Sequence, residues 1–188
     1  MTRPKIFLCS YDKKNGSGRE QLRGIIETEL SLPAGSVKYG EEPNGKPFLL
    51  GFSEVHISIS HSKDLIALYI GHDEAGIDIE HLKPRTNAGD IASLYFSGEE
   101  QKDIHKEGKD SLILFYKIWT TKEAELKRLG SGIGSIHRLN TSIIPIGRHW
   151  LIGKKYILCL SAPEPVLQSL EIISLLDTIP KITFYDHS

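Results

Sequence analysis

Residues 110–129 have the spacing of one long helix with a single apolar face, and a helix of this kind has to pack against the rest of the fold. Gly130 closes the segment, as glycine commonly does at helix ends. Strand-like runs precede it, because residues 55–60 alternate apolar and polar side chains and residues 65–70 are apolar throughout. The side chains of the apolar face fall within about 60° of arc and are Leu112, Phe115, Trp119 and Leu126.

The remaining elements are mixed along the chain, so we predict the α+β class. Asn44-Gly45-Lys46-Pro47 has the composition of a turn. The polar residues 86–89 separate two parts, for which we predict the bounds 1–86 and 87–188. We expect strands over 5–11, 77–80, 148–152, 155–161 and 170–175, and helices over 19–31, 90–95 and 98–106.

The charge balance excludes some classes of partner. The 188 residues include 23 basic and 24 acidic side chains, so general affinity for nucleic acid or anionic membrane is not expected. No stretch approaches the roughly 20 apolar residues of a membrane span, and the four-residue apolar run near the N-terminus is too short for a signal peptide. The two cysteines, Cys9 and Cys159, form no C-x-x-C motif and suit a reducing compartment. We therefore expect a cytoplasmic protein.

Gly76-Ile77-Asp78-Ile79-Glu80 reads as a short strand that carries two acids on one face. Side chains two residues apart in a strand project together, so Asp78 and Glu80 share a face opposite Ile77 and Ile79. A divalent cation such as Mg²⁺ would relieve their repulsion, since it takes oxygen ligands and substrate phosphates. A solvated edge strand explains the same five residues, and on this segment alone it is the more economical interpretation.

Glu123 projects about 40° from Trp119, beside the apolar stripe of the long helix. An acid on that side is costly unless it is paired or bound to a metal. Two interpretations stay open. Glu123 can form an ordinary ion pair with Lys127 one turn later, or it can be a third oxygen ligand while Lys127 reaches a phosphate.

Ser60-His61-Ser62 ends a strand in a polar turn that could cradle a phosphate with hydroxyl, imidazole and backbone N–H groups. The same residues could form a nucleophilic Ser-His site, but no G-x-S-x-G elbow surrounds them. Taken singly, His61 is more often a structural or surface histidine.

Together, these segments resemble the 4′-phosphopantetheinyl transferases of the two-half, surfactin-activating type. The family's marks are a Gly-Lys-Pro turn, a Ser-His turn, a G-[IV]-D-[IVL]-E strand and a W-[ST]-x-K-E-[AS]-x-x-K helix. They stand here as Gly45 to Pro47, Ser60 to Ser62, Gly76 to Glu80 and Trp119 to Lys127. Phe96-Ser97 followed by Glu99 is similar to the family's F-S-x-x-E segment. The likeness spans about residues 19–135.

The resemblance implies a pseudo-dimer of two similar α/β halves that binds coenzyme A in the cleft between them. It implies transfer of phosphopantetheine from coenzyme A to a serine of an acyl or peptidyl carrier protein, with release of adenosine 3′,5′-bisphosphate. The partner would supply the nucleophile, and a working monomer is favoured. A magnesium-dependent hydrolase of coenzyme A or a nucleotide diphosphate is the alternative, and a non-catalytic module that binds the carrier or coenzyme A is a third.

The resemblance also assigns roles to single residues. Asp78, Glu80 and Glu123 would hold Mg²⁺ against the diphosphate, with Asp78 also counted among the coenzyme A contacts. Lys127 would neutralise or protonate the leaving group, and Glu123 or a metal-bound water would accept the serine proton. The coenzyme A contacts would come from Lys46 at the adenosine end and from Ser60 and His61 at phosphate. Arg19 is expected at the terminal phosphate, with Lys13 or Lys14 as substitutes.

Overall fold

The computed structural model describes residues 3–12, 18–139, 141, 147–176 and 181–185. The helices are α1 (Gly18–Glu29), α2 (Ala88–Tyr95), α3 (Gly98–Lys106), α4 (Ser111–Leu129) and α5 (Glu164–Ser169), with 3₁₀ turns at Gly108–Asp110 and Ile133–Arg138. The strands are β1 (Lys5–Ser10), β2 (Tyr39–Glu41), β3 (Pro47–Leu49), β4 (His56–Ser62), β5 (Leu65–Gly71), β6 (Gly76–His81), β7 (Gly147–Ile152), β8 (Tyr156–Ser161), β9 (Glu171–Ser174) and β10 (Ile182–Tyr185).

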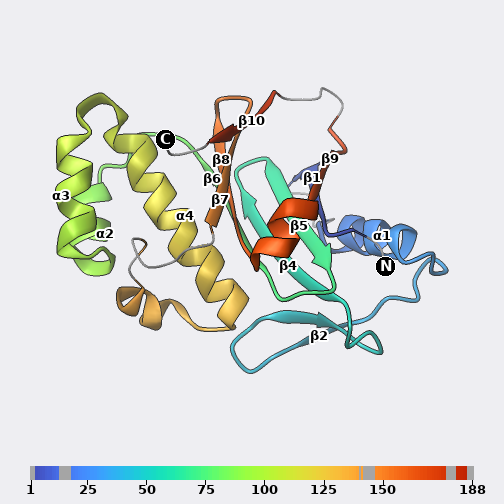
Figure 1. The fold of residues 1–188 in the computed structure, drawn as a ribbon. Helices are drawn as coiled ribbons and strands as arrows, with labels where there is room; N and C mark the ends of the chain where they lie inside the picture. The colour runs from blue at the N-terminus through green and yellow to red at the C-terminus, as the bar shows by residue number, and fades with distance from the viewer. Residues whose placement is uncertain (1–2, 13–17, 140, 142–146, 177–180, 186–188) are drawn as a thin grey trace.

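Two four-stranded sheets form the centre of the molecule, in the orders β4-β5-β1-β9 and β10-β7-β8-β6 (Figure 1). In the first sheet β1 pairs antiparallel with β5 and parallel with β9. The second sheet is antiparallel throughout. A two-stranded ribbon of β2 and β3 stands apart from both sheets.

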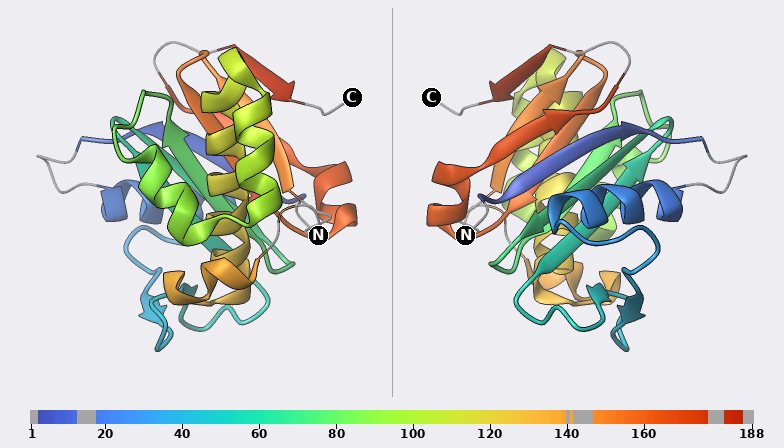
Figure 2. Two further views of the ribbon diagram at one scale, coloured as in Figure 1. Left: turned by 90° about the vertical axis from the view of Figure 1, so that its left-hand side faces the viewer. Right: turned by 90° about the vertical axis from the view of Figure 1, so that its right-hand side faces the viewer.

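The helices and sheets are arranged in layers (Figures 1 and 2), and clusters of apolar side chains pack between them. The largest cluster lies between the two sheets and includes Leu8, Ile77, Ile79 and Leu158. A second cluster packs α1 against the outer face of the first sheet, and a third packs α2, α3 and α4 against Ile157 of the second sheet. The order of layers is therefore α1, first sheet, second sheet, α4. No helix in the described part of the chain is long and apolar enough to span a membrane.

The α+β class is confirmed, and each predicted helix and strand is present within a few residues of its expected bounds. The predicted turn at 44–47 connects β2 to β3. The division at residue 86 stays a prediction, as does the likeness of the two halves, and two strands cross that boundary. β6 comes from the first part and belongs to the second sheet, whereas β9 comes from the second part and belongs to the first sheet.

Candidate active site

Helix α4 crosses β6 at very short range, and Gly76 makes this possible. A Cβ atom at Gly76 would lie 1.8 Å from the carbonyl oxygen of Ala124 and 2.5 Å from the amide nitrogen of Arg128. Only glycine can stand where two backbones approach so closely. The first residue of the acidic strand therefore sets the separation between that strand and the helix that carries Glu123.

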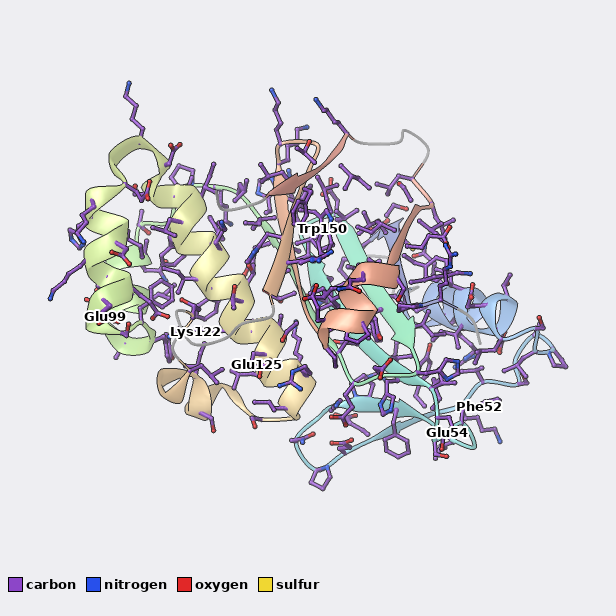
Figure 3. The ribbon with its side chains drawn as sticks, in the orientation of Figure 1. Phe52, Glu54, Glu99, Lys122, Glu125 and Trp150 are labelled. Atoms are coloured by element: carbon purple, nitrogen blue, oxygen red, sulfur yellow. The ribbon has the colours of Figure 1, made fainter. Side chains whose placement is uncertain are left out.

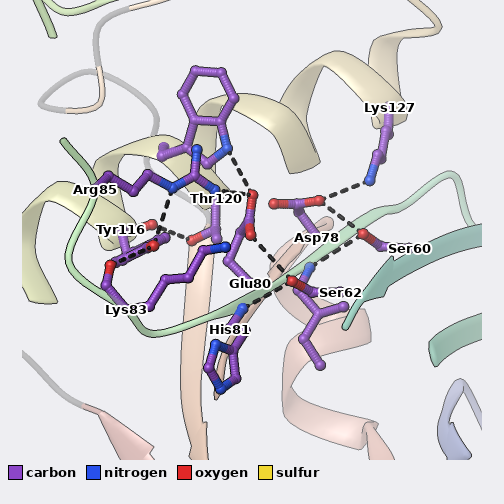
Figure 4. A network of polar contacts seen from close by, with 12 residues as sticks. Ser60, Ser62, Asp78, Glu80, His81, Lys83, Arg85, Tyr116, Thr120 and Lys127 are labelled. Carbon is purple, nitrogen blue, oxygen red and sulfur yellow. Dashed lines mark hydrogen bonds and ion pairs between the residues drawn. The ribbon is translucent and has the colours of Figure 1, made fainter. Parts of the chain in front are cut away.

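Asp78 lies on the face of β6 that is turned toward α4, and it is 6% exposed. Its Oδ1 atom accepts hydrogen bonds from Ser60 Oγ at 2.8 Å and from Lys127 Nζ at 2.8 Å (Figure 4). Its Oδ2 atom is buried and has no hydrogen-bond partner among the described residues. Ile77 and Ile79 point into the core between the sheets, as the alternation in the sequence predicts.

Glu80 shares the face of Asp78 and is held by three donors. Its Oε1 atom accepts from Arg85 Nη2 at 3.0 Å and from Trp119 Nε1 at 3.2 Å, and its Oε2 atom accepts from Ser62 Oγ at 3.2 Å. Sequence reasoning missed Arg85 and the indole of Trp119. Trp119 was expected only as part of an apolar stripe, although an indole N–H that is buried usually finds an acceptor.

Glu123 is half-buried on α4, the helix that packs against β6. Burial raises its pKa, and the negative charges of Asp78 and Glu80 raise it further, while Lys127 opposes the shift. The helix acid and the two strand acids therefore influence one another electrostatically, while their sharing of one cation stays a prediction. In the described structure Lys127 pairs with Asp78 rather than with Glu123.

The chemistry of these carboxylates suits a hard divalent cation. The buried Asp78 Oδ2 has no hydrogen-bond partner among the described residues, and the pKa of Glu123 is raised by burial first and then by the charges of Asp78 and Glu80. As the side chains stand, no group of three or more histidine, cysteine, aspartate or glutamate residues in the described part of the chain is arranged to hold a metal ion. Lys127 and Arg85 engage oxygens of Asp78 and Glu80 instead.

Two adjoining hollows lie beside this site. The larger, of about 540 Å³, is bordered by α1, the β2–β3 ribbon and β4, and Arg19 and His61 line it. The smaller, of about 170 Å³, is lined by Lys46 and Lys127 and shares Gly45, Pro47 and Ile59 with the larger one. The hollows thus lead from Arg19 to Lys127, which pairs with Asp78.

Ser60 and His61 were expected to act together on phosphate, but they lie on opposite faces of β4. The Ser60 side chain is buried against Asp78, whereas His61 is exposed and stacks on Tyr11 with ring centroids 4.7 Å apart. Adjacent residues of a strand point to opposite faces, which explains the separation. Lys13 and Lys14, the expected substitutes for Arg19, lie outside the described residues.

Lys46 contacts the C-terminal end of α4. Its Nζ atom donates to the Arg128 carbonyl at 3.0 Å and lies 3.6 Å from Glu74 Oε1. Asn44 donates to the carbonyl of Gly130, which ends the helix with φ 61°. The Asn-Gly-Lys-Pro turn therefore caps the orphan carbonyls of α4, in keeping with the preference for cations at helix C-termini.

The assignment of Glu99 to the F-S-x-x-E segment is wrong by one residue. Glu99 is exposed on α3, whereas Lys122 of α4 is fully buried (both labelled in Figure 3). Glu100 is 2% exposed, completes the capping box of α3 with Ser97 and pairs with Lys122 at 2.9 Å. Burial would raise the pKa of Glu100, but Lys122 and hydrogen bonds from Thr141 and Ser97 hold it below its usual value. This ion pair ties α3 to α4 one residue before Glu123.

Comparisons with known proteins find one family model and several relatives that match this chain. Residues 74–163 match the model of a family described as the 4′-phosphopantetheinyl transferase superfamily. The 4′-phosphopantetheinyl transferase AcpT of Escherichia coli is 30% identical over 162 residues, which cover 84% of this chain and 80% of that protein. HetI of Nostoc sp. is 28% identical over 75% of this chain and 62% of its own length. Sfp of Bacillus subtilis is 30% identical over 60% of this chain. The matched region covers only 50% of the length of Sfp.

Proposed function

Because this chain belongs to the 4′-phosphopantetheinyl transferase superfamily, we propose that it transfers 4′-phosphopantetheine from coenzyme A to a serine of a carrier protein. The observation that carries the proposal is that Lys127 pairs with Asp78, whose charge, like that of Glu80, acts on Glu123. Lys127 also lines a hollow together with Lys46, and the adjoining hollow is lined by Arg19. Carboxylates and a lysine that converge beside such a cleft suit phosphoryl transfer, which depends on positioning and on charge stabilisation.

In the proposed reaction the carrier serine Oγ forms a bond to the phosphorus that bears the pantetheine arm. The bond from this phosphorus to the bridging oxygen breaks, and adenosine 3′,5′-bisphosphate leaves with the electron pair. Glu123 accepts the serine proton. A positioned carboxylate is a common general base, and Glu123 is the helix carboxylate on which the charges of Asp78 and Glu80 act, which makes it the acceptor we propose.

Asp78, Glu80 and Glu123 would hold Mg²⁺. When it is bound, the cation offsets the negative charge of the diphosphate and of the departing phosphate. Lys127 would give up its contact with Asp78 and neutralise the leaving group. Its side chain is 31% exposed, so this movement requires little rearrangement of the core.

Coenzyme A would lie along the two adjoining hollows. Arg19 and His61 would bind its terminal phosphate in the larger hollow, and Lys46 would reach its adenosine end from the turn beside α4. Ser60 would act through Asp78, because its hydroxyl is already engaged there.

We further propose that an acidic, helical acyl or peptidyl carrier protein is the macromolecular partner, and that neither nucleic acid nor membrane is one. The carrier would dock near Gly130–Gly134, where the side chain of Leu129 is 50% exposed. The protein would work as a monomer in the cytoplasm. The even charge balance supports a local rather than a general attraction to polyanions.

The experiment that tests this function measures release of adenosine 3′,5′-bisphosphate from coenzyme A and Mg²⁺, with and without an apo carrier protein. We expect release only when the carrier is present, in an amount that equals the carrier modified. Release without any carrier would identify a hydrolase, in which water takes the place of the serine. No release with a panel of fatty acid, polyketide and peptide carriers would contradict the proposal.

A further inference from the structure

Three serines at alternate positions of β4 join the two sheets next to the candidate site. Their Oγ atoms accept hydrogen bonds from backbone amides of β6 at 3.0, 3.3 and 2.9 Å, in the pairs Ser58 with Ile77, Ser60 with Ile79, and Ser62 with His81. β4 and β6 are strands of different sheets, so hydroxyl groups make the connection here. Because each hydroxyl accepts from an amide, its own hydrogen is free to donate elsewhere.

Two of the three serines use this hydrogen on a carboxylate. Ser60 donates to Asp78 Oδ1 at 2.8 Å, and Ser62 donates to Glu80 Oε2 at 3.2 Å (Figure 4). Ser58 contacts the Ile77 amide and, among the described residues, donates to no carboxylate. Each of the three serines therefore accepts one hydrogen bond from a β6 amide, and only Ser60 and Ser62 also donate one to a carboxylate.

We propose that Ser60, and to a smaller extent Ser62, are positioning residues that fix the carboxylates of Asp78 and Glu80 for cation and diphosphate binding. This inference rests on the proposed function, because the effect of the serines on the rate of transfer presupposes that reaction. A hydroxyl anchored to a backbone amide has a fixed oxygen, so it holds its carboxylate in one orientation. Groups that orient metal-ligating carboxylates contribute to affinity and rate without touching the metal themselves.

The contacts indicate that Ser60 matters more than Ser62 for the orientation of its carboxylate. Asp78 has two donors, Ser60 and Lys127, and Lys127 is expected to leave it when substrate binds. Ser60 then becomes the remaining described donor to that carboxylate. Glu80 keeps Arg85 and Trp119 when Ser62 is removed, so its orientation depends less on one hydroxyl.

The test compares Ser60→Ala, Ser62→Ala and Ser58→Ala in the full chain, with Ser60→Thr as the conservative variant. Calorimetric titration with Mg²⁺ measures cation affinity without carrier or turnover, and steady-state kinetics separate kcat from KM for coenzyme A. We expect Ser60→Ala to lower cation affinity and kcat each by about 10- to 100-fold. Ser62→Ala should have a smaller effect, and Ser60→Thr should restore most of the loss.

Ser58→Ala is the matched control, because it removes the same bond between the sheets and no bond to a carboxylate. The titrations are made at a temperature where the Ser60→Ala and Ser58→Ala variants are both folded, so a folding defect cannot imitate the difference in cation affinity. Equal cation affinity in the Ser60 and Ser58 variants would overturn the inference, as would a Ser60→Ala effect confined to KM for coenzyme A. If the wild-type protein transfers to no carrier, the proposed function fails, and the Mg²⁺ titration still decides the role of Ser60.

Discussion

Replacing Gly76 with alanine would insert a methyl group into the backbone of α4. The new Cβ atom would lie 1.8 Å from the Ala124 carbonyl oxygen, whereas real Cβ atoms essentially never come within 3.0 Å of another group. The strand and the helix would have to separate by more than an ångström, and the atom in the way is rigid backbone. Glu123 lies next to Ala124, so it would move away from Asp78 by a comparable distance.

The cost has two parts that can be measured separately. Overpacking a well-packed interior costs about 1–3 kcal/mol of the free energy of unfolding, which urea denaturation measures. Misplacing reacting groups by 1 Å costs about a hundredfold in rate, which a transfer assay measures under conditions where the variant is folded. Gly89→Ala in α2 is the control, because a Cβ there meets nothing within 4 Å. Wild-type stability and rate in Gly76→Ala would refute the claim that this close contact sets the site geometry.

Three further substitutions probe other parts of the account. Glu123→Gln should lower the transfer rate by about a hundredfold or more, because the proton acceptor is lost. Folding raises the pKa of Glu123. The free energy of unfolding of the cation-free wild type should therefore fall as the pH rises from the unfolded-state pKa through the folded-state pKa of this residue. Urea denaturation at several pH values should show this fall in the wild type and not in Glu123→Gln. Lys122→Met should lower the free energy of unfolding by about 3–5 kcal/mol, because it leaves Glu100 buried and unpaired. Urea denaturation measures this loss, with Glu99→Gln as a control that should change the stability little. An equal loss of stability in the two variants would contradict the prediction. Arg19→Ala should raise KM for coenzyme A by about tenfold and leave KM for dephospho-coenzyme A unchanged, and equal changes for both substrates would exclude Arg19 from the terminal phosphate.

The placement of the three acids on their strand and helix could be predicted from the sequence because it follows simple periodicities. Alternation in the strand places Asp78 and Glu80 on one face, and helical spacing places Glu123 beside the apolar stripe. Neither pattern shows which hydrogen-bond donor each carboxylate oxygen accepts from. Ser60 was predicted at phosphate because its side chain was considered together with His61, although β4 turns the two side chains in opposite directions.

Other features depend on contacts between distant segments, which a single sequence does not display. The buried partner of Lys122 is Glu100 and not Glu99. The F-S-x-x-E spacing, counted from Phe96-Ser97, already places this glutamate at residue 100, but its pairing with Lys122 depends on packing between α3 and α4. The turn at 44–47 was predicted, but not that it caps α4 through Lys46. The flanking strands β2 and β3 are three residues long each, too short to leave a clear alternation.

The most direct test of the account is intact-mass spectrometry of an apo carrier protein after incubation with coenzyme A, Mg²⁺ and the enzyme. Wild-type enzyme should add one phosphopantetheine to each carrier molecule. Asp78→Ala and Glu123→Ala should leave the carrier unmodified over the same time, since loss of either carboxylate should slow the reaction by about a thousandfold. Full modification by either variant, or none by the wild type across a panel of carriers, would contradict the claim that these acids on β6 and α4 form the site of phosphopantetheine transfer.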